Sequence, residues 1–170
     1  MKVILYMAIT INGLIAKENG DSDWVSEEDT EQFIKKCRET GAVIMGRHTY
    51  DILYPNDLPL KQGIHVVLTK NKSLISDKPT VIFTDKTLKD ILSMLEEKGY
   101  KEACIIGGSQ TVSQFVAQGL VDEVYLDVEP LFFGKGIPLI KDADFEYKLK
   151  LLELKKLNEN TVQLHYKIEK

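Results

Sequence analysis

Short, fully apolar runs alternate along the chain with amphipathic segments. A run of about four to eight residues that is apolar throughout is typical of a strand buried on both faces of a sheet. Glycine, or Asn followed by glycine, closes most of these runs, which predicts loops at the carboxyl ends of the strands. Four such strands are expected, at Val3–Ile9, Ala42–Met45, His65–Leu68 and Ala103–Ile106.

The segments between these runs have the spacing of amphipathic helices. In the first of them, Phe33, Ile34 and Cys37 recur at the interval that puts side chains on one helical face. A further short strand, Thr80–Thr84, precedes the second helix. Strands that alternate with helices predict βαβ units and a parallel sheet. The expected helices are Glu27–Glu39, Leu88–Lys98 and Gln110–Gln118.

The pattern changes in the last third of the chain, where strands follow one another without helices. Glu123–Glu129 has the pattern of a strand, and Tyr147–Leu157 and Val162–Ile168 flank an Asn-Glu-Asn turn, which predicts an antiparallel hairpin. The last strand alternates apolar and polar residues, so we expect it near the sheet edge, with one face, including His165, toward solvent. Residues 1–170 are therefore predicted to form one α/β domain with a mixed sheet of about eight strands.

Composition and charge narrow the classes of function. The 170 residues carry 22 Lys and Arg against 26 Asp and Glu, a formal net charge of −4, and 44% of them are hydrophobic. This balance predicts a globular protein without a basic surface for nucleic acid or an anionic membrane. Arg38 and Arg47 are the only arginines of the chain. Arginine is the residue that best binds phosphate or carboxylate groups in two-pronged contacts.

The amino-terminal stretch and the cysteines indicate a cytoplasmic protein. Residues 3–16 are uncharged and follow Lys2, but an Asn-Gly pair interrupts their apolar run, so a buried strand is expected rather than a signal peptide. Cys37 and Cys104 have no CxxC spacing and no histidine cluster nearby. They are predicted to be buried free thiols in a reducing compartment.

Two glycine junctions at the ends of predicted strands are candidates for nucleotide binding, because ligands of α/β sheets bind outside the carboxyl ends of parallel strands. At Gly46-Arg47, glycine would let the backbone approach a ligand and the arginine could fork onto a phosphate. A strand-to-helix turn with a surface arginine fits that pattern equally well. Gly107-Gly108 precedes a helix whose first turn offers hydroxyl and amide donors, which suits a pyrophosphate cradle and, equally, a tight turn.

A third candidate is the segment Trp24–Phe33. Asp29 and Phe33 are four residues apart, so they share one face of the predicted helix and could present a carboxylate beside a stacking ring. The spacing Ser26-x-x-Asp29 also matches a capping box, in which the carboxylate only bonds back to the helix start. Both interpretations stay open on the pattern alone, where capping has the stronger support.

Metal and hydrolase chemistry find no support in the sequence. His48, His65 and His165 are scattered, and no His or Cys pair has the spacing of metal ligands. The nucleophile motif GxSxG does not occur. No metal is therefore expected.

Taken in order, these segments resemble the dihydrofolate reductase superfamily across nearly the whole chain. Residues 8–16 and Trp24 are similar to the family's first strand and the mobile loop over the nicotinamide, and Val43–Thr49 is similar to its first cofactor-phosphate segment. Val66–Thr69 resembles the strand whose end meets the ribose phosphate of the cofactor, and Ile105–Gly108 resembles the Gly-Gly segment under the pyrophosphate. The resemblance implies a three-layer α/β/α fold and an NADPH-dependent reductase.

The resemblance also implies roles for individual residues. Asp29 falls on the active-site carboxylate, which would be catalytic, and Phe33 falls on the ring that packs against a pterin. Ala8 and Trp24 join them as expected substrate contacts. The residues expected to bind NADPH are Ile9, Gly13, Ile15, Gly46, Arg47, His48, Thr49, Leu68, Thr69, Lys70, Ile106, Gly107, Gly108, Ser109, Gln110 and Thr111.

Departures from the resemblance point away from folate. Gln62-Gly63-Ile64 stands where folate enzymes place an arginine for the glutamate tail of the substrate, and no spare arginine is expected nearby. Val112 replaces the tyrosine expected near the nicotinamide. Residues 119–124 and 130–139 instead resemble the reductase domain of riboflavin biosynthesis. The short loop Asn56–Gln62 departs from the longer loops expected for a phosphoribosyl substrate.

The expected function is hydride transfer from NADPH to a small heterocyclic substrate, most like the 5-amino-6-(5-phosphoribosylamino)uracil reductase of riboflavin biosynthesis. Dihydrofolate reduction is the alternative within the same chemistry, and the missing arginine counts against it. A non-catalytic nucleotide-binding module is the alternative from another class, and NADPH consumption with a candidate substrate separates the two. The expected partners are a small-molecule substrate and a second copy of the chain in a homodimer.

Overall fold

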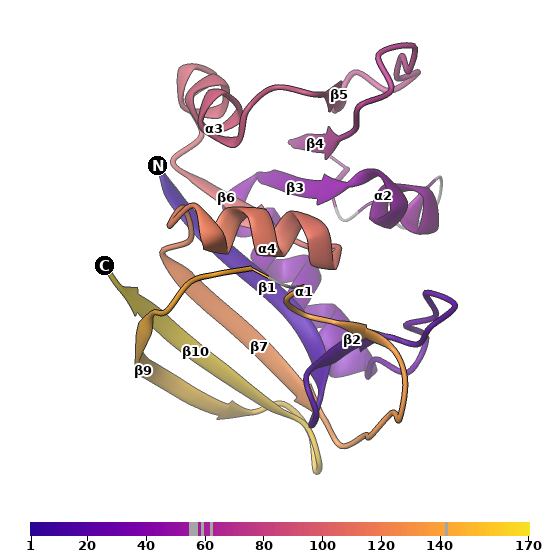
Figure 1. Ribbon diagram of the computed structural model, residues 1–170, viewed down its shortest axis with the longest axis vertical. Helices are drawn as coiled ribbons and strands as arrows, with labels where there is room; N and C mark the ends of the chain where they lie inside the picture. Colours follow the sequence, from indigo (N-terminus) through magenta and orange to yellow (C-terminus); the bar gives the residue numbers. More distant parts are fainter. Residues whose placement is uncertain (55–57, 59, 62, 142) are drawn as a thin grey trace.

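The computed structural model describes residues 1–54, 58, 60–61, 63–141 and 143–170 as a sheet with helices on both sides (Figure 1). The strands of this sheet are β1 (Lys2–Thr10), β3 (Ala42–Gly46), β4 (Ile64–Leu68), β5 (Val81–Thr84), β6 (Glu102–Ile105), β7 (Glu123–Glu129), β9 (Lys148–Lys156) and β10 (Val162–Glu169). Within the described residues, the 8-stranded sheet has the order β5-β4-β3-β6-β1-β7-β10-β9. The predicted mixed sheet of about eight strands is confirmed.

The sheet is parallel from β5 to β7 and antiparallel at its other end. β1 pairs in parallel with both β6 and β7, and β3 pairs in parallel with β4 and β6. β10 runs antiparallel to β7 and to β9, so the predicted C-terminal hairpin is present. The carboxyl ends of the parallel strands share one edge of the sheet, which is where ligands of such sheets bind.

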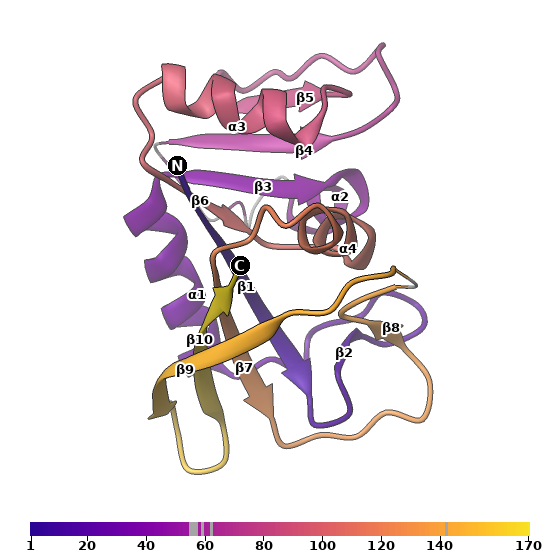
Figure 2. The same cartoon turned by 60° about the vertical axis from the view of Figure 1, so that its left-hand side comes forward.

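Helices cover both faces of the sheet and give the three layers expected from the sequence (Figures 1 and 2). The helices are α1 (Glu27–Thr40), α2 (Arg47–Leu53), α3 (Leu88–Glu97) and α4 (Ser109–Ala117). Cys37 of α1 and Tyr50 of α2 are buried against one face, whereas Ile91 of α3 and Phe115 of α4 are buried against the other. α2 shows no helical period in the sequence because it has only 7 residues. In the described ranges, no helix combines the length and apolar character needed to cross a bilayer.

A second, two-stranded sheet joins the loop after β1 to the segment after β7. β2 (Leu14–Ala16) pairs antiparallel with β8 (Ile137–Pro138). Gly136 permits this pairing, because a Cβ there would lie 2.5 Å from the carbonyl oxygen of Ala16. The sequence does not predict this sheet, since strands of three and two residues are too short to show a period.

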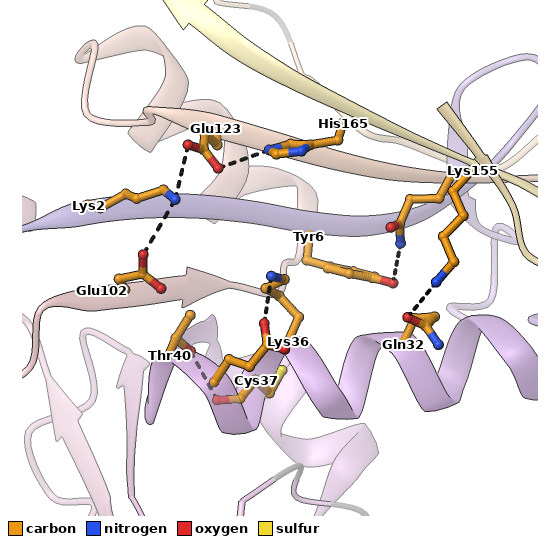
Figure 3. Close-up of polar contacts among 12 residues, drawn as sticks. Lys2, Tyr6, Gln32, Lys36, Cys37, Thr40, Glu102, Glu123, Lys155 and His165 are labelled. Atoms are coloured by element: carbon orange, nitrogen blue, oxygen red, sulfur yellow. Dashed lines mark hydrogen bonds and ion pairs between the residues drawn. The ribbon is translucent and has the colours of Figure 1, made fainter. Parts of the chain in front are cut away.

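The face of β10 that the sequence assigns to solvent is covered at Gln163 and His165, so the prediction is wrong there, while Lys167 and Glu169 of the same face are exposed. Gln163 is buried, and the His165 ring stacks on Tyr125 with 3.9 Å between the ring centroids. His165 also bonds to Glu123, which pairs with Lys2 (Figure 3). The alternation of polar residues misleads here because α1 lies over this face and the polar side chains pair with one another across the strands.

β9 forms an edge of the sheet and leaves apolar side chains exposed. Leu149, Leu151 and Leu154 are each more than two-fifths accessible to solvent. Exposed apolar edge strands favour pairing with another chain. The homodimer stays a prediction.

Candidate active site

A cleft of about 1620 Å³ runs along the carboxyl ends of the parallel strands. One half lies over the loops after β3, β4, β5 and β6, and the other half reaches between β1 and α1. The cleft brings most of the predicted site residues together. Those in its wall are Ala8, Ile15, Asp29, Phe33, Gly46, Arg47, His48, Thr49, Leu68, Thr69, Lys70, Ile106, Gly108, Ser109, Gln110 and Thr111.

The two glycine junctions meet in the half of the cleft over the loops after β3, β4, β5 and β6. We call this part the nucleotide half. The backbone N–H of Gly46 donates to the carbonyl oxygen of Gly107 at 2.8 Å. A Cβ on Gly46 would lie 2.8 Å from Oγ1 of Thr111, so a side chain there would force a shift. Gly107 has a φ of 107°, which L residues rarely adopt. The backbone conformation therefore requires glycine at position 107, whereas at position 46 the close approach of the Thr111 side chain favours glycine.

Unoccupied donors collect where α4 begins. Its N-cap residue, Gly108, has no side chain that could accept from the N–H groups of the first turn. The hydroxyl of Ser109 is buried, and its Oγ has no hydrogen-bond partner among the described residues. Free amides at a helix start beside such a hydroxyl suit a phosphate or pyrophosphate group. The residues present therefore fit the phosphates of a dinucleotide cofactor.

The outer end of the nucleotide half carries cationic and hydroxyl groups. Arg47, Thr69 and Lys70 line it. The Nε of Arg47 donates to Asp51 at 2.6 Å, and its guanidinium lies 5.7 Å from the centre of the Phe83 ring. The Asp51 contact uses Nε, so the terminal nitrogens of Arg47 can still fork onto a phosphate.

Sequence analysis missed several residues in the same region. Thr84, Lys86 and Thr87 line the cleft beside Thr69, because β4 and β5 are adjacent parallel strands. Their position directly after a predicted strand is the signal that could identify them.

The other half of the cleft is lined mostly by apolar side chains. Tyr6 and Ala8 of β1 and Asp29 and Phe33 of α1 line it. The rings of Tyr6 and Phe33 pack edge to face with 5.7 Å between their centroids. Asp29 and Phe33 reach the same cavity, as their helical spacing predicts. An apolar wall with a polar group in it is typical of sites for small heterocycles.

The start of α1 decides between the two interpretations of Asp29. The Ser26 hydroxyl caps the helix by accepting from the backbone N–H of Asp29 at 3.4 Å. In a capping box, the Asp29 carboxylate would accept from the backbone N–H of Ser26. That N–H instead donates to Glu129 of β7 at 2.9 Å. The side chain of Asp29 therefore plays no part in the cap, and its carboxyl is available to the cleft.

The Asp29 carboxyl keeps its proton at neutral pH. Asp29 is 2% exposed, and this burial is the main reason that its pKa rises to about 9. The neighbouring carboxyl groups of Asp127 and Glu129 raise the pKa further. Its Oδ2 has no hydrogen-bond partner within the described part of the chain. A buried carboxyl in this state can hydrogen-bond a substrate and give it a proton.

Four residues with predicted roles are not in the wall of the cleft that the described residues form. These are Ile9, Gly13, Trp24 and Gly107. The Trp24 ring packs edge to face on Phe133, with 5.4 Å between the ring centroids. The assigned roles of these four residues stay predictions.

The region in which folate enzymes carry their arginine is described only in part. Gln62 and most of the loop Asn56–Gln62 lie outside the described residues. Gly63 has a φ of 116°, and a Cβ there would lie 2.4 Å from the carbonyl oxygen of Gly41. The position of Gly63 therefore has no room for a side chain of any kind.

Cationic side chains line the cleft, although the residues just before β4 include no arginine. Arg38 of α1 and Lys61 both line the cleft. Arg38 follows Asp29 by nine residues, which is about 14 Å along the helix axis. Arg38 reaches the cleft from the last turn of α1 rather than from the chain just before β4.

The layered fold, the phosphate cradle and the buried carboxyl together define a dihydrofolate reductase-like domain. The chain belongs to the RibD C-terminal domain family, whose model matches residues 1–163. The expected relationship to the reductase domain of riboflavin biosynthesis is thus confirmed.

Individual relatives agree with this assignment. The protein YwjB of Bacillus subtilis (strain 168) is 31% identical over 171 residues, covering 97% of this chain and 97% of YwjB. A protein of Shewanella sp. PV-4 assigned to riboflavin biosynthesis has a TM-score of 0.86 at 23% identity, covering 100% of both chains. The diaminohydroxyphosphoribosylaminopyrimidine deaminase/5-amino-6-(5-phosphoribosylamino)uracil reductase of Thermotoga maritima has a TM-score of 0.79 at 23% identity, covering 99% of this chain and 56% of its own. At these identities the two structures show a shared fold.

Proposed function

We propose that this protein is an NADPH-dependent reductase acting on a small heterocycle of the 5-amino-6-(5-phosphoribosylamino)uracil type. The observation that carries the proposal is that one cleft joins a phosphate cradle to a buried carboxyl that keeps its proton. Reduction of a C=N or C=O group needs a hydride and a proton, and these two features suit the two requirements. The Thermotoga maritima protein of the same fold carries the name of this reductase.

The nucleotide half of the cleft would hold the cofactor. NADPH, when bound, supplies the hydride. The first-turn amides of α4 and the Ser109 hydroxyl bind its pyrophosphate, and Arg47, Thr69 and Lys70 bind its 2′-phosphate. These assignments use donors that the cleft already presents.

The other half would hold the substrate. Tyr6 and Phe33 pack against the heterocycle and exclude water, while Asp29 hydrogen-bonds to it and gives it a proton. Arg38 and Lys61 can bind a phosphate or carboxylate at the outer end of the substrate. Both an aminouracil ribose phosphate and dihydrofolate carry such an anionic group.

A substrate panel tests the proposal. NADPH oxidation is measured with the aminouracil ribose phosphate and with dihydrofolate. Faster turnover of the aminouracil supports the proposal, and faster turnover of dihydrofolate transfers the function to the second candidate, whose glutamate tail Arg38 could also bind. Tight NADPH binding without oxidation in the presence of either substrate would instead identify a nucleotide-binding module.

Arg47→Ala is expected to weaken the binding of NADPH much more than that of NADH. The lost contact is a charge-assisted bond to the 2′-phosphate, worth about 1.5 to 3 kcal/mol, so the Kd for NADPH should rise by roughly 10- to 100-fold. Titration of both cofactors by fluorescence measures the ratio. Arg38→Ala changes the other arginine of the chain and should leave the ratio as it is. Equal losses of both cofactors in Arg47→Ala would remove this role from Arg47.

A further inference from the structure

Three buried carboxyl groups meet beneath the half of the cleft that reaches between β1 and α1, which we call the substrate half. Asp29 of α1 and Asp127 and Glu129 of β7 are 2%, 0% and 2% exposed. Among the described residues, no Lys, Arg or His forms an ion pair with any of them. Three buried carboxylates without a cation cannot all be ionised, so at least one must hold a proton.

Asp127 and Glu129 each accept several hydrogen bonds, and at Asp127 these bonds favour the ionised form of the carboxyl group. The Tyr6 hydroxyl donates to Oδ2 of Asp127 at 2.5 Å, and the Gln163 amide donates to Oδ1 at 2.8 Å. Tyr6 extends from β1 on the side of α1 (Figure 3). Glu129 accepts from the backbone and hydroxyl of Ser26 and from the Thr161 hydroxyl.

Among the described residues, no hydrogen bond donated to the Asp29 carboxyl is found, which makes Asp29 the member of the cluster most suited to hold the proton. Its Oδ2 has no partner among the described residues, and its carboxyl hydrogen-bonds to Asp127. The hydrogen bonds that Asp127 accepts from Tyr6 and Gln163 stabilise its ionised form, so we assign the hydrogen of the contact between the two carboxyls to Asp29. The hydrogen-bond pattern thus distinguishes the protonated member of the pair from the ionised one.

We propose that Asp127 is a positioning residue that keeps Asp29 protonated and oriented for proton transfer to the substrate. This inference rests on the proposed function. In the step it serves, the O–H bond of Asp29 breaks and its proton goes to the heteroatom of the substrate C=N or C=O group. The adjacent carbon takes the hydride that NADPH would supply when bound, which would leave NADP⁺, and Asp29 is left as a carboxylate that regains its proton from water.

The surroundings of Asp29 agree with this assignment. The titratable groups that face it are Tyr6 of β1 and Asp127 and Glu129 of β7, while β10 contributes the neutral Gln163. Burial raises the pKa of Asp127 as well, but its hydrogen bonds from Tyr6, Gln163 and Asp29 work against that rise. Burial also raises the pKa of Tyr6, which keeps its hydroxyl protonated as a donor.

Asp127→Asn tests the proposal in the full-length protein without ligands. Infrared spectroscopy of the protonated carboxyl stretch, recorded across pH, follows the proton directly. The wild type should show a protonated carboxyl at pH 7 that titrates near pH 9 and is absent from Asp29→Asn. Removing the negative charge of Asp127 makes ionisation of Asp29 easier, so the midpoint in Asp127→Asn should fall by at least about one pH unit.

Two further variants show how far the titration midpoint depends on each neighbouring carboxylate. They also keep the test possible if Asp127→Asn does not fold. Glu129→Gln removes the other neighbouring carboxylate and should lower the midpoint by less, because Glu129 contributes less to the raised pKa. Glu123→Gln removes a carboxylate of the same strand that pairs with Lys2 and His165, and the midpoint should not move. An unchanged midpoint in Asp127→Asn, or in Glu129→Gln if Asp127→Asn does not fold, would overturn the proposal.

Kinetics separate this proposal from the proposed function. The alkaline limb of kcat/KM should move to lower pH in Asp127→Asn, in step with the infrared midpoint, whereas a purely structural role of Asp127 would lower activity equally at all pH values. If no substrate is reduced but the infrared midpoints shift as expected, the proton assignment stands and the proposed function fails. If substrate is reduced and the limb does not move, the role of Asp127 is refuted.

Discussion

Replacing Asp29 with asparagine is expected to lower kcat by roughly 10²-fold or more, because asparagine cannot give a proton to the substrate. NADPH affinity should stay close to that of the wild type, since Asp29 lies in the half of the cleft away from the phosphate cradle. Steady-state kinetics and a cofactor titration on the same preparation measure both effects. The loss in kcat with little change in cofactor binding is the signature of an interaction made during the chemical step.

The same substitution should leave the free energy of unfolding unchanged or raise it at neutral pH. The pKa of Asp29 is about 9 in the folded protein against an ordinary value of 3.8, so the folded state binds a proton that the unfolded state releases between these pH values. The stability that this group contributes is therefore fully present below about pH 4 and is lost as pH rises toward 9. Asparagine has no such dependence. At pH 7 to 9 the melting temperature of Asp29→Asn should equal or exceed that of the wild type.

Glu28→Gln is the matched control for Asp29→Asn. Glu28 is the preceding residue of α1, but its side chain is exposed and bonds to Asn158 rather than facing the cleft. Its replacement should leave kcat unchanged. Wild-type turnover in Asp29→Asn on the true substrate would show that Asp29 is not the acid of this reaction.

Adding one methyl group to the cradle is expected to impair cofactor binding severely. In Gly46→Ala the new Cβ would lie 2.8 Å from Oγ1 of Thr111, which is closer than real Cβ contacts allow. Thr111 is buried, so relief of the clash must displace its side chain, α4 or the Gly46 backbone, all of which belong to the wall of the proposed phosphate site. We expect the Kd for NADPH to rise by roughly 30-fold or more, a cost of about 2 kcal/mol. Isothermal titration calorimetry measures this loss.

A second substitution shows whether the clash is the cause. Thr111→Ala removes the hydroxyl that the new methyl group meets, so Gly46→Ala combined with Thr111→Ala should recover part of the affinity. Gly134→Ala is the control, because a Cβ at Gly134 meets nothing within 4 Å in the described structure. Full affinity in Gly46→Ala alone would mean that the cradle is not where the cofactor binds.

The local pattern of the sequence was sufficient to predict the strands that are long and uniformly buried and the helices that are regularly amphipathic. The runs at Val3–Ile9 and Ala42–Met45 and the helix at Glu27–Glu39 appear within a residue or two of their predicted bounds. Apolar runs and helical periods are local properties of the chain, so sequence is enough to detect them. α2, β2 and β8 are too short to show a clear helical or strand period in the sequence. Their bounds were therefore not predicted.

The candidate site was predicted in its nucleotide half and only partly in its substrate half. Arg47 and Ser109 follow strand ends, and strand ends can be read from sequence. Asp29 was found through its helix and through family resemblance, but its competing role as a cap could be removed only when Glu129 was seen to take the Ser26 N–H. Arg38 was missed because the search for a cation followed position along the chain rather than the course of α1 across the cleft.

The sequence by itself determined the longer strands and helices, the glycine junctions and the position of Asp29 on its helix. The tertiary structure decided which groups surround the Asp29 carboxyl. Asp29 and Asp127 are 98 positions apart, and they meet only because β7 pairs in parallel with β1 while α1 crosses the same face. Periodicity reports whether a side chain is buried but not which strand becomes its neighbour. The protonation of Asp29 depends on those neighbours, since burial and adjacent carboxylates, rather than the residue type, set its pKa.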